Sequence, residues 1–388
     1  MFEENIRLLK EKGLLRQIFD RERLFEKAGR ASIPSLARIV IAGTEYCNFA
    51  SNDYLGLSAS PVLADAAKKA VQLFPFGGGA SRLLSGGTEF HEELEKAVAG
   101  FKATEAALIF NSGYQANTST IPAIAGEGDV IFSDELNHAS IVDGCRLSSA
   151  RKVIYRHRDI DHLRSVILKE GGRKKIIITD TVFSMDGDIA PIRQLYSLCT
   201  GIPDIILYLD DAHGTGVLGD GRGALAHFDI KPEPWIIQMG TFSKALGSFG
   251  AFVAANREIV DWLINTSRGF IYSTALPPCV VAASAAAITI IKSDRSLIDK
   301  LWVNQRRTIE GIKKAGFDIK STESPIISVS VGDLHQTLAF SEELKRRRIY
   351  APAIRPPTVR SSRIRITVSA VHTDDDMETL ITAFLELG

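Results

Sequence analysis

Hydrophobic and polar residues follow three successive patterns along the chain. Residues 1–50 begin with apolar side chains near helical spacing, which predict a helix over about the first thirty residues and then a short hairpin. Residues 51–280 contain short runs that are apolar throughout, and helical patterns fill most of the gaps between them. These runs cover residues 106–110, 130–132, 153–155, 176–179, 205–209, 235–239 and 251–254.

The last segment, residues 281–388, has a third pattern, in which long helical stretches precede short strands and further helices. Helices are predicted at 280–292, 295–315, 336–347 and 373–387, and strands at 326–331, 350–353 and 364–368. This order is typical of a smaller α+β domain.

The middle segment predicts an α/β fold. Runs that are apolar throughout fit strands covered by helices on both faces, and the alternation with helices predicts a largely parallel sheet. We therefore expect an N-terminal helix and hairpin in residues 1–50, a large α/β domain in 51–280 and a small α+β domain in 281–388. Because ligands bind at the carboxyl ends of the strands in such a sheet, the candidate functional residues are those that follow each run.

The composition is that of an ordinary globular protein. The 388 residues include 46 Lys and Arg against 46 Asp and Glu, and 45% are hydrophobic. These values argue against a disordered chain, and the zero net charge argues against a nucleic-acid binder. The N-terminus lacks the apolar core of a secretory signal, and the most apolar stretch, residues 280–291, is too short to span a bilayer. We expect a cytoplasmic protein that binds neither nucleic acid nor membrane.

The cysteines indicate neither a metal site nor a disulfide framework. Cys47, Cys145, Cys199 and Cys279 stand far apart, with no CxxC pair and no histidine at zinc-finger spacing. We expect four reduced, partly buried thiols and no bound metal.

Three polar turns follow predicted strands and could contact a ligand. Residues 111–117 (NSGYQAN) place a Ser-Gly turn and a helix start after the first run, which makes a ready anion site. His138 begins a predicted helix after the second run, and Ser184 lies in a turn with three carboxylates after the fourth. Each has an ordinary alternative, such as a strand-to-helix turn or a helix-capping histidine. The carboxylate turn does not match a calcium loop, because its spacing is wrong and no Glu closes it.

A further turn, residues 210–219 (DDAHGTGVLG), combines Asp210 and His213 with a GxGxxG pattern. That pattern is the fingerprint of a dinucleotide site and raises the alternative of an NAD-binding oxidoreductase. The fingerprint should open a helix near the first strand of a sheet. This one continues into residues 220–223 (DGRG) and follows about the fifth strand, so we disfavour the oxidoreductase.

Lys244 follows the run at 235–239, beside Thr241 and Ser243. A lysine at the end of a buried strand can be desolvated, which lowers its pKa and lets it form a Schiff base with a carbonyl. The ordinary alternative is a lysine that extends from a loop into solvent. Together the strand ends offer an amine nucleophile, an anion site, a carboxylate and a flat aromatic ring, which are the groups that pyridoxal 5'-phosphate (PLP) requires.

Six strings carry a resemblance to a known family. They are SNDYLGL (51–57), NSGYQAN (111–117), LNHASIVDGCRL (136–147), FSMDGD (183–188), DDAHGTGVLG (210–219) and TFSKALG (241–247). With these strings in this order and spacing, the chain from about residue 14 to its C-terminus resembles the α-oxoamine synthases. These are fold-type I PLP-dependent enzymes that condense an amino acid with an acyl thioester and release carbon dioxide.

The resemblance implies catalytic roles for Lys244, Asp210 and His138. Lys244 would hold the cofactor's aldehyde covalently and, once the amino substrate displaces it, would take the Cα proton. Asp210 would keep the pyridine nitrogen protonated. His138 would stack on the ring, where it also meets the substrate.

The resemblance also implies which residues bind the rest of the cofactor. His213 and Ser184 would hydrogen-bond to the side of the ring that carries the hydroxyl group. The N–H groups of Gly113 and Tyr114, together with Thr241, would hold the phosphate.

For the substrates, the resemblance implies that Arg365 pairs with the amino-acid carboxylate. Arg16 would contact the acyl chain, with Arg21 as an alternative, and Thr358 is the other acyl-side candidate. Family members are homodimers, so a homodimer is expected.

Two strings near the C-terminus bear on the substrates. Residues 351–359 (APAIRPPTV) and 363–367 (RIRIT) resemble the biotin-pathway member of the family, which would use L-alanine and a pimeloyl thioester. Whether the acyl carrier is coenzyme A or a carrier protein stays open, and glycine C-acetyltransferase is a close alternative. The link at 359–362 is shorter than usual in the family, and Ser243 stands where some members have Gly.

Overall fold

The structure, a computed structural model, describes residues 2–12, 14–15, 18, 20–22, 35–321 and 323–388. It contains two compact units. Unit 1 comprises residues 1–52, 185–187 and 301–388, and unit 2 comprises residues 53–184 and 188–300. The sequence placed the second boundary near residue 280. The structure places it near 300, because α11 (Pro278–Ser293) packs against α2 (Pro61–Leu73) and α3 (Glu89–Lys102) of unit 2.

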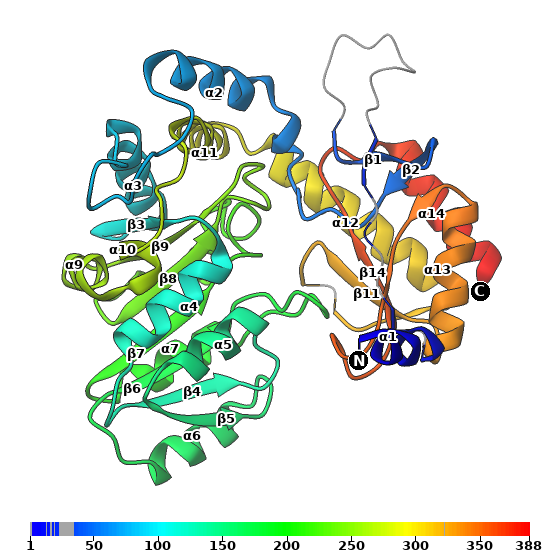
Figure 1. Ribbon diagram of the computed structural model, residues 1–388. Helices are drawn as coiled ribbons and strands as arrows, with labels where there is room; N and C mark the ends of the chain where they lie inside the picture. Colours follow the sequence, from blue (N-terminus) through cyan, green and yellow to red (C-terminus); the bar gives the residue numbers. More distant parts are fainter. Residues whose placement is uncertain (1, 13, 16–17, 19, 23–34, 322) are drawn as a thin grey trace. The chain divides into compact units, whose positions relative to one another are not determined.

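Unit 2 is built on one seven-stranded sheet (Figure 1). In spatial order its strands are β3 (Ala106–Phe110), β9 (Ala251–Ala255), β8 (Ile236–Thr241), β7 (Ile205–Asp210), β6 (Lys175–Asp180), β4 (Val130–Asp134) and β5 (Arg151–Tyr155). Neighbouring strands pair in parallel except at β9, which runs antiparallel to both β3 and β8. The predicted α/β fold with a largely parallel sheet is confirmed.

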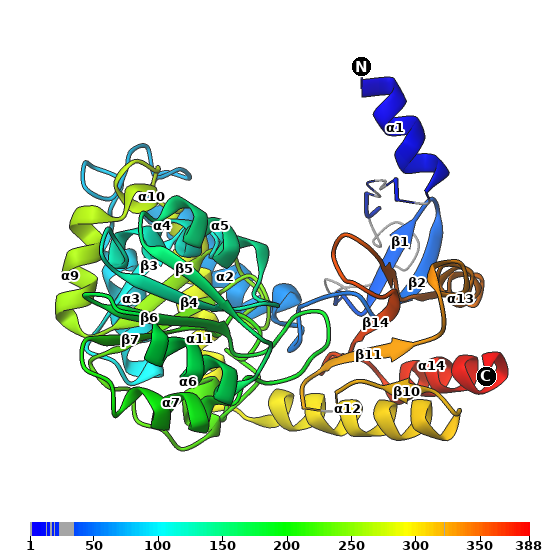
Figure 2. The same cartoon turned by 90° about the horizontal axis from the view of Figure 1, so that it is seen from below.

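Helices lie on both faces of this sheet (Figure 2). One face carries α4 (Gly113–Ile124), α5 (Ala139–Leu147), α9 (Arg257–Thr266) and α10 (Arg268–Ile271), and the other carries α3, α6 (Ile160–Lys169) and α7 (Ile192–Cys199). The strand residues of β6 pack against α4, as Ile176 and Ile178 share a core with Ile121 and Ile124. Burial on both faces explains why the sequence of these strands is apolar throughout.

The edge strand β5 departs from that pattern. The run at 153–155 predicted a strand covered on both faces, but Ile154 is 56% exposed and Arg151 and Lys152 are also exposed. The prediction was wrong for this strand, three of whose five residues are exposed. The edge position alone is not the reason, because β3 at the opposite edge is buried throughout; the faces of β5 are incompletely covered. Charged side chains on an edge strand are a common protection against pairing with another chain.

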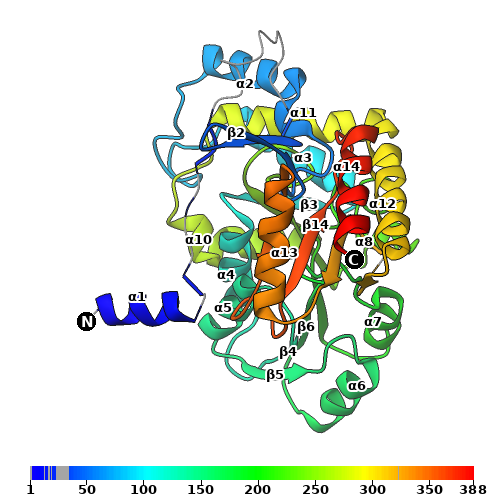
Figure 3. The same ribbon diagram turned by 90° about the vertical axis from the view of Figure 1, so that its right-hand side faces the viewer.

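Unit 1 contains two small sheets. Four strands form an antiparallel sheet in the order β10 (Asp318–Ile319), β11 (Ile326–Ser330), β14 (Arg363–Thr367) and β13 (Ala353–Ile354). Three more form the order β1 (Arg38–Ile41), β2 (Thr44–Asn48) and β12 (Ile349–Tyr350). In Figure 3 the helices α13 (Leu334–Arg346) and α14 (Asp374–Leu387) run beside β14.

The core of unit 1 lies between its helices and the four-stranded sheet. Ile312 of α12 (Ser296–Lys314), Leu344 of α13 and Phe384 of α14 pack against Ile327 and Ile366. Helix α12 belongs to unit 2 as far as residue 300 and to unit 1 from residue 301.

Two predicted elements of unit 1 were wrong in extent. The strand expected at 350–353 is divided between β12 and β13, because Pro352 has no N–H to donate to a ladder. The helix expected over about thirty residues is observed only as α1 (Phe2–Glu11), and Glu22 bridges Val40 in an antiparallel pair. The last part of the expected helix, residues 23–30, lies outside the described residues. Helix α1 buries none of its residues, so no tertiary packing extends it.

The remaining elements of unit 2 are a 3-10 turn at Leu57–Ala59 and the short helix α8 (Ala224–His227).

All four cysteines are buried and none forms a disulfide. In the part of the chain that the structure describes, no helix has both the length and the apolar character needed to cross a membrane.

Candidate active site

One pocket of unit 2 lies at the carboxyl ends of β6, β7 and β8 and beside the first turns of α4 and α5. It encloses about 590 Å³, counting the space open to solvent. Eight residues that the sequence assigned to a cofactor all line it: Gly113, Tyr114, His138, Ser184, Asp210, His213, Thr241 and Lys244. The topology of the parallel sheet therefore brings residues that are up to 131 positions apart into one site.

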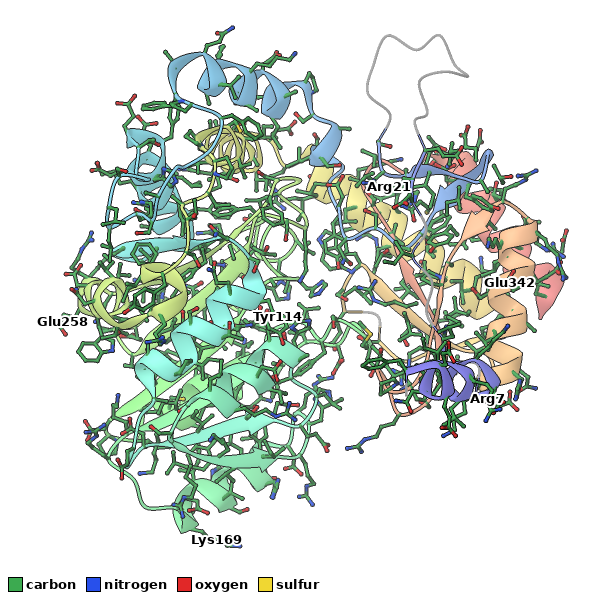
Figure 4. All side chains as sticks on the ribbon, in the orientation of Figure 1. Arg7, Arg21, Tyr114, Lys169, Glu258 and Glu342 are labelled. Carbon is green, nitrogen blue, oxygen red and sulfur yellow. The ribbon has the colours of Figure 1, made fainter. Side chains whose placement is uncertain are left out.

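The first turn of α4 forms one wall of the pocket. Ser112 caps this helix, as its Oγ accepts a hydrogen bond from the Gln115 N–H at 3.1 Å. The first N–H groups of a helix have no partner within the helix, so those of Gly113 and Tyr114 can meet an anion. Figure 4 labels Tyr114 at this turn.

Two hydroxyl groups lie side by side after β8. Thr241 Oγ1 lies 2.6 Å from Ser243 Oγ and donates to the Gly250 carbonyl at 2.7 Å. The Ser243 N–H donates to Thr241 Oγ1 at 3.1 Å, which fixes the turn that leads to Lys244. The pocket thus has short polar groups at a second wall, as an anion site requires.

Asp210 lies on the floor of the pocket at the end of β7, with 3% of its surface exposed. Its Oδ2 accepts from Asn117 Nδ2 at 2.7 Å, and its Oδ1 accepts from the Ala212 N–H at 3.0 Å. Burial raises the pKa of Asp210, while the charge of Lys244 and the hydrogen bond from Asn117 oppose that rise. A positively charged N–H group in the pocket would further favour its ionised form.

Asn117 is held on both sides, so it orients Asp210. Its Nδ2 also donates to Ser140 Oγ at 2.8 Å, and its Oδ1 accepts from the Tyr208 hydroxyl at 2.7 Å. All four side chains are buried.

His138 is the N-cap of α5 and faces the pocket. Its backbone N–H donates to Asp180 Oδ2 at 2.7 Å, and its Nδ1 lies 2.7 Å from Ser140 Oγ. Burial lowers the pKa of His138, so the ring is favoured in its neutral form. A neutral, flat ring at this position can stack on a planar ligand.

Two further groups complete the pocket. His213 Nδ1 lies 2.7 Å from the hydroxyl of the buried Tyr54, which orients the imidazole. Burial and the nearby charge of Asp210 raise the pKa of Asp180 well above its ordinary value. The positive charge of Lys244 thus opposes the rise in the pKa of both buried carboxyl groups, which lie on adjacent strands.

Lys244 lies three residues beyond the end of β8 and is half-buried. The sequence suggested a desolvated lysine, but the opening of the pocket leaves part of this side chain in contact with solvent. Its charge acts on His138, Asp180 and Asp210, which places the amine within the electrostatic reach of all three.

Comparison with known proteins gives a family. The model of the family "Aminotransferase class I and II" matches residues 44–384. The chain belongs to this family. A protein of Thermodesulfovibrio yellowstonii, provisionally named 8-amino-7-oxononanoate synthase, is 53% identical over 389 residues, which cover 100% of this chain and 97% of that one. An 8-amino-7-oxononanoate synthase of Geotalea daltonii is 45% identical over 394 residues, covering 100% and 97%.

Among solved structures, a serine palmitoyltransferase variant of S. paucimobilis with bound PLP-myriocin aldimine is 28% identical to this chain. The match covers 100% of this chain and 96% of that one, with a TM-score of 0.91. These matches confirm the family resemblance found in the sequence, together with the fold-type I architecture.

The predicted substrate-binding residues belong to unit 1. Arg365 lies in β14, is buried, and donates from Nη2 to Asn52 Oδ1 at 3.1 Å. Thr358 and Arg21 are exposed. Arg16 lies outside the described residues.

Sequence reasoning missed Asn117, Asp180 and Tyr54 as members of the site. Asn117 could have been found, because it follows Gly113 by four residues and so shares its face of a helix. Asp180 ends an apolar run, the position that ligands use in parallel sheets. Tyr54 lies in the string SNDYLGL (51–57), but that string gave it no role, because its partner His213 is 159 residues away.

The glycines of the GxGxxG pattern have packing roles in this family member. A Cβ at Gly214 would lie 2.2 Å from Asp211 Oδ1, and Gly216 has a φ of +83° beside Ala245. The pattern leads to turns and then to α8, which has only four residues.

Within the described part of the chain, no three His, Cys, Asp or Glu side chains are grouped so as to hold a metal ion.

Proposed function

We propose that this chain is an 8-amino-7-oxononanoate synthase. Such an enzyme is a PLP-dependent acyltransferase of biotin biosynthesis that condenses L-alanine with a pimeloyl thioester and releases carbon dioxide and the free thiol. The names of relatives that are 53% and 45% identical over the whole chain support this proposal. The observation that carries it is the pocket in which Lys244 and the buried Asp210 face the same space as a helix N-terminus.

The donors of this pocket fit PLP group by group. Lys244 Nζ would hold the aldehyde covalently, and Asp210 would accept from the pyridine N–H. The N–H groups of Gly113 and Tyr114 with the Thr241 hydroxyl would hold the phosphate. A carboxylate has about four lone-pair sites, and two are used at Asp210, so it can accept the further hydrogen bond.

Three more residues fit the ring of the cofactor. His138, favoured in its neutral form, would stack on the ring face. His213, oriented by Tyr54, would donate to the ring hydroxyl together with Ser184. When bound, PLP supplies an electron sink that stabilises negative charge on the Cα atom of the amino acid.

Lys244 is the proposed base. Once the amino substrate had displaced it, its Nζ would be an amine that could take the proton from the substrate Cα. Asp210 holds the opposite charge on the floor of the same pocket, and Asn117 keeps its carboxylate in one orientation.

For the substrates we propose the following residues of unit 1. Arg365 binds the carboxylate of L-alanine, because a guanidinium forms two parallel hydrogen bonds with a carboxylate. Thr358 and either Arg16 or Arg21 contact the acyl group. We also propose that the enzyme is a homodimer.

The test is an assay of the purified protein after addition of PLP. A new visible absorbance with PLP and alanine-dependent release of thiol from pimeloyl-CoA or a pimeloyl carrier protein are expected. Release only from glycine plus acetyl-CoA would assign the chain to glycine C-acetyltransferase, and release only from L-serine plus a long-chain acyl-CoA to serine palmitoyltransferase. A protein that binds NAD and gains no absorbance with PLP would overturn the proposal.

A further inference from the structure

His157 lies two residues after β5 and contacts two carboxylates that come from different parts of the chain. Its Nδ1 lies 3.0 Å from Asp134 Oδ1 at the end of β4. Its Nε2 lies 2.7 Å from Asp188 Oδ2, in the loop that follows β6. Carboxylates only accept hydrogen bonds, and a neutral imidazole has only one N–H, so both contacts can be hydrogen bonds only if the ring is protonated.

The loop that His157 contacts also carries a residue of the pocket. Its two ends are joined, since the Phe183 N–H donates to the Asp188 carbonyl at 2.9 Å and Val182 bridges Ile189. The Phe183 ring meets the His157 ring edge-on, at 4.4 Å between centroids and 89° between planes. Ser184 is the next residue, and it lines the pocket. His157 therefore contacts the loop on both sides of Ser184.

We propose that protonated His157 is a positioning residue that holds the loop of residues 182–189, so that Ser184 meets the cofactor. The inference rests on the proposed function, since it takes the ligand of the pocket to be PLP. His157 itself does not line the pocket and acts through Asp188 and Phe183.

The charges around His157 favour its protonated form. Asp134 faces it from β4, Asp188 from the loop, and Glu135 accepts from its backbone N–H at 3.1 Å. Arg158 Nη1, 3.3 Å from Asp188 Oδ2, is the nearby group of like charge. Burial lowers the pKa of His157, but its hydrogen bonds to Asp134 and Asp188 outweigh this effect and raise the pKa to about 9. The contact with the loop is thus retained at neutral pH and lost as the pH rises through about 9.

The experiment is a double-mutant cycle on PLP affinity. The dissociation constant of PLP from the apoprotein is measured by tryptophan fluorescence for the wild type, His157→Gln, Ser184→Ala and the double variant. A hydrogen bond to a charged group contributes more than 1.4 kcal/mol, so His157→Gln should raise the dissociation constant of PLP by about tenfold. The double variant should bind PLP no more weakly than the weaker-binding of the two single variants, because both changes remove the contact between Ser184 and the cofactor.

Controls separate this inference from the proposed function. His335→Gln makes the same chemical change on an exposed residue of α13 and should leave the dissociation constant within about twofold of the wild type. If the wild type does not bind PLP, the proposed function fails. If it binds PLP and His157→Gln binds equally well, or if the two changes multiply in the double variant, only the positioning role is overturned.

Two further measurements keep the inference testable if His157→Gln does not fold. Asp188→Ala removes the same contact from the loop side and should show the same non-additivity with Ser184→Ala. In the foldable variants, the ratio of the variant to the wild-type dissociation constant should fall toward one between pH 7 and pH 10, because the wild type loses its charged imidazole there. A ratio that stays constant across this range overturns the role of the charge.

Discussion

Asp210 and Asp211 are neighbours at the end of β7, yet they belong to two different regions of unit 2. Asp210 faces the pocket, where Asn117 is its side-chain donor. Asp211 faces a closed cluster, where Lys102 Nζ lies 2.7 Å from its Oδ2. Both are buried, with 3% and 2% of their surfaces exposed.

The closed cluster satisfies its charges internally. Lys102 also donates to the Arg222 carbonyl at 2.6 Å, and Asp211 Oδ1 accepts from Thr181 Oγ1 at 2.6 Å. The Ala224 N–H donates to the same oxygen at 3.2 Å, which ties the turn after β7 to this cluster. A buried ion pair with this many partners has a structural role.

The pocket differs because its carboxyl groups outnumber its cations. Burial raises the pKa of Asp210, and that of Asp180 rises well above its ordinary value. Perturbed carboxyl groups in a pocket are typical of functional sites, whereas a matched pair in a closed cluster is not. Equal burial of two adjacent residues can therefore serve binding in one case and stability in the other.

The largest effect is expected for Lys244→Ala, which removes the cation from the pocket side. Turnover should fall by at least about a thousandfold, because the covalent link to the cofactor and the proposed base are both lost. The melting temperature should change little, since the side chain is only half-buried. Thiol release and thermal unfolding measure the two outcomes. Substantial remaining turnover would refute the assigned base.

Asp210→Asn should lower kcat by about a hundredfold to a thousandfold while PLP is still bound. The amide keeps the shape of the side chain but cannot hold a pyridine nitrogen protonated. Absorbance titration with PLP and steady-state kinetics check both parts. An unchanged kcat would remove Asp210 from its proposed role and with it the contrast to Asp211.

Lys102→Met should instead lower stability and leave turnover nearly unchanged. It leaves Asp211 buried without its cation, which should lower the free energy of unfolding by about 3–5 kcal/mol, while kcat per folded molecule stays close to that of the wild type. Lys96→Met on the same helix α3 is the matched control, because its ion pair with Glu92 is exposed. That variant should change stability by less than about 1 kcal/mol. A large loss of kcat in Lys102→Met would mean that the closed cluster also serves the reaction.

His372 in unit 1 is a further buried group, and both of its ring nitrogens have suitable hydrogen-bond partners only when the ring is neutral. Its Nδ1 accepts from the Ser369 N–H at 3.0 Å, its Nε2 lies 3.0 Å from the Asn48 carbonyl, and its ring stacks on Phe49. Burial lowers the pKa of His372 to about 4.

The sign of the resulting pH dependence follows from proton binding. Between about pH 6.5 and pH 4 the unfolded chain holds a proton on this residue that the folded chain does not, so stability falls as the pH falls. The loss should reach about 3 kcal/mol for this group. Urea midpoints across this range should fall less in His372→Gln than in the wild type and His335→Gln. Equal slopes in all three proteins would contradict the prediction.

The local parts of this protein were determined by its sequence. The apolar runs of β3, β4, β6, β7 and β8 predicted strands covered on both faces, and the polar motifs after them predicted the lining of the pocket. This was possible because strand burial and helix starts depend on neighbouring residues. The same reasoning was wrong at β5, because the cover over each face of a strand depends on how distant elements pack on the sheet.

Only the tertiary structure decided which distant residues meet. The pattern along the chain does not give the order in which the elements pack. That order brings Asn117 to Asp210, 93 positions away, and Tyr54 to His213, 159 positions away. The resemblance assigned Asp210 to the cofactor, but the pattern of apolar residues alone does not say that Asp210 faces the pocket and Asp211 faces Lys102. Successive strand residues point to opposite sides, and a shift of one position would exchange them. Periodicity constrains each element, but the packing of the elements selects the partner of each buried charge.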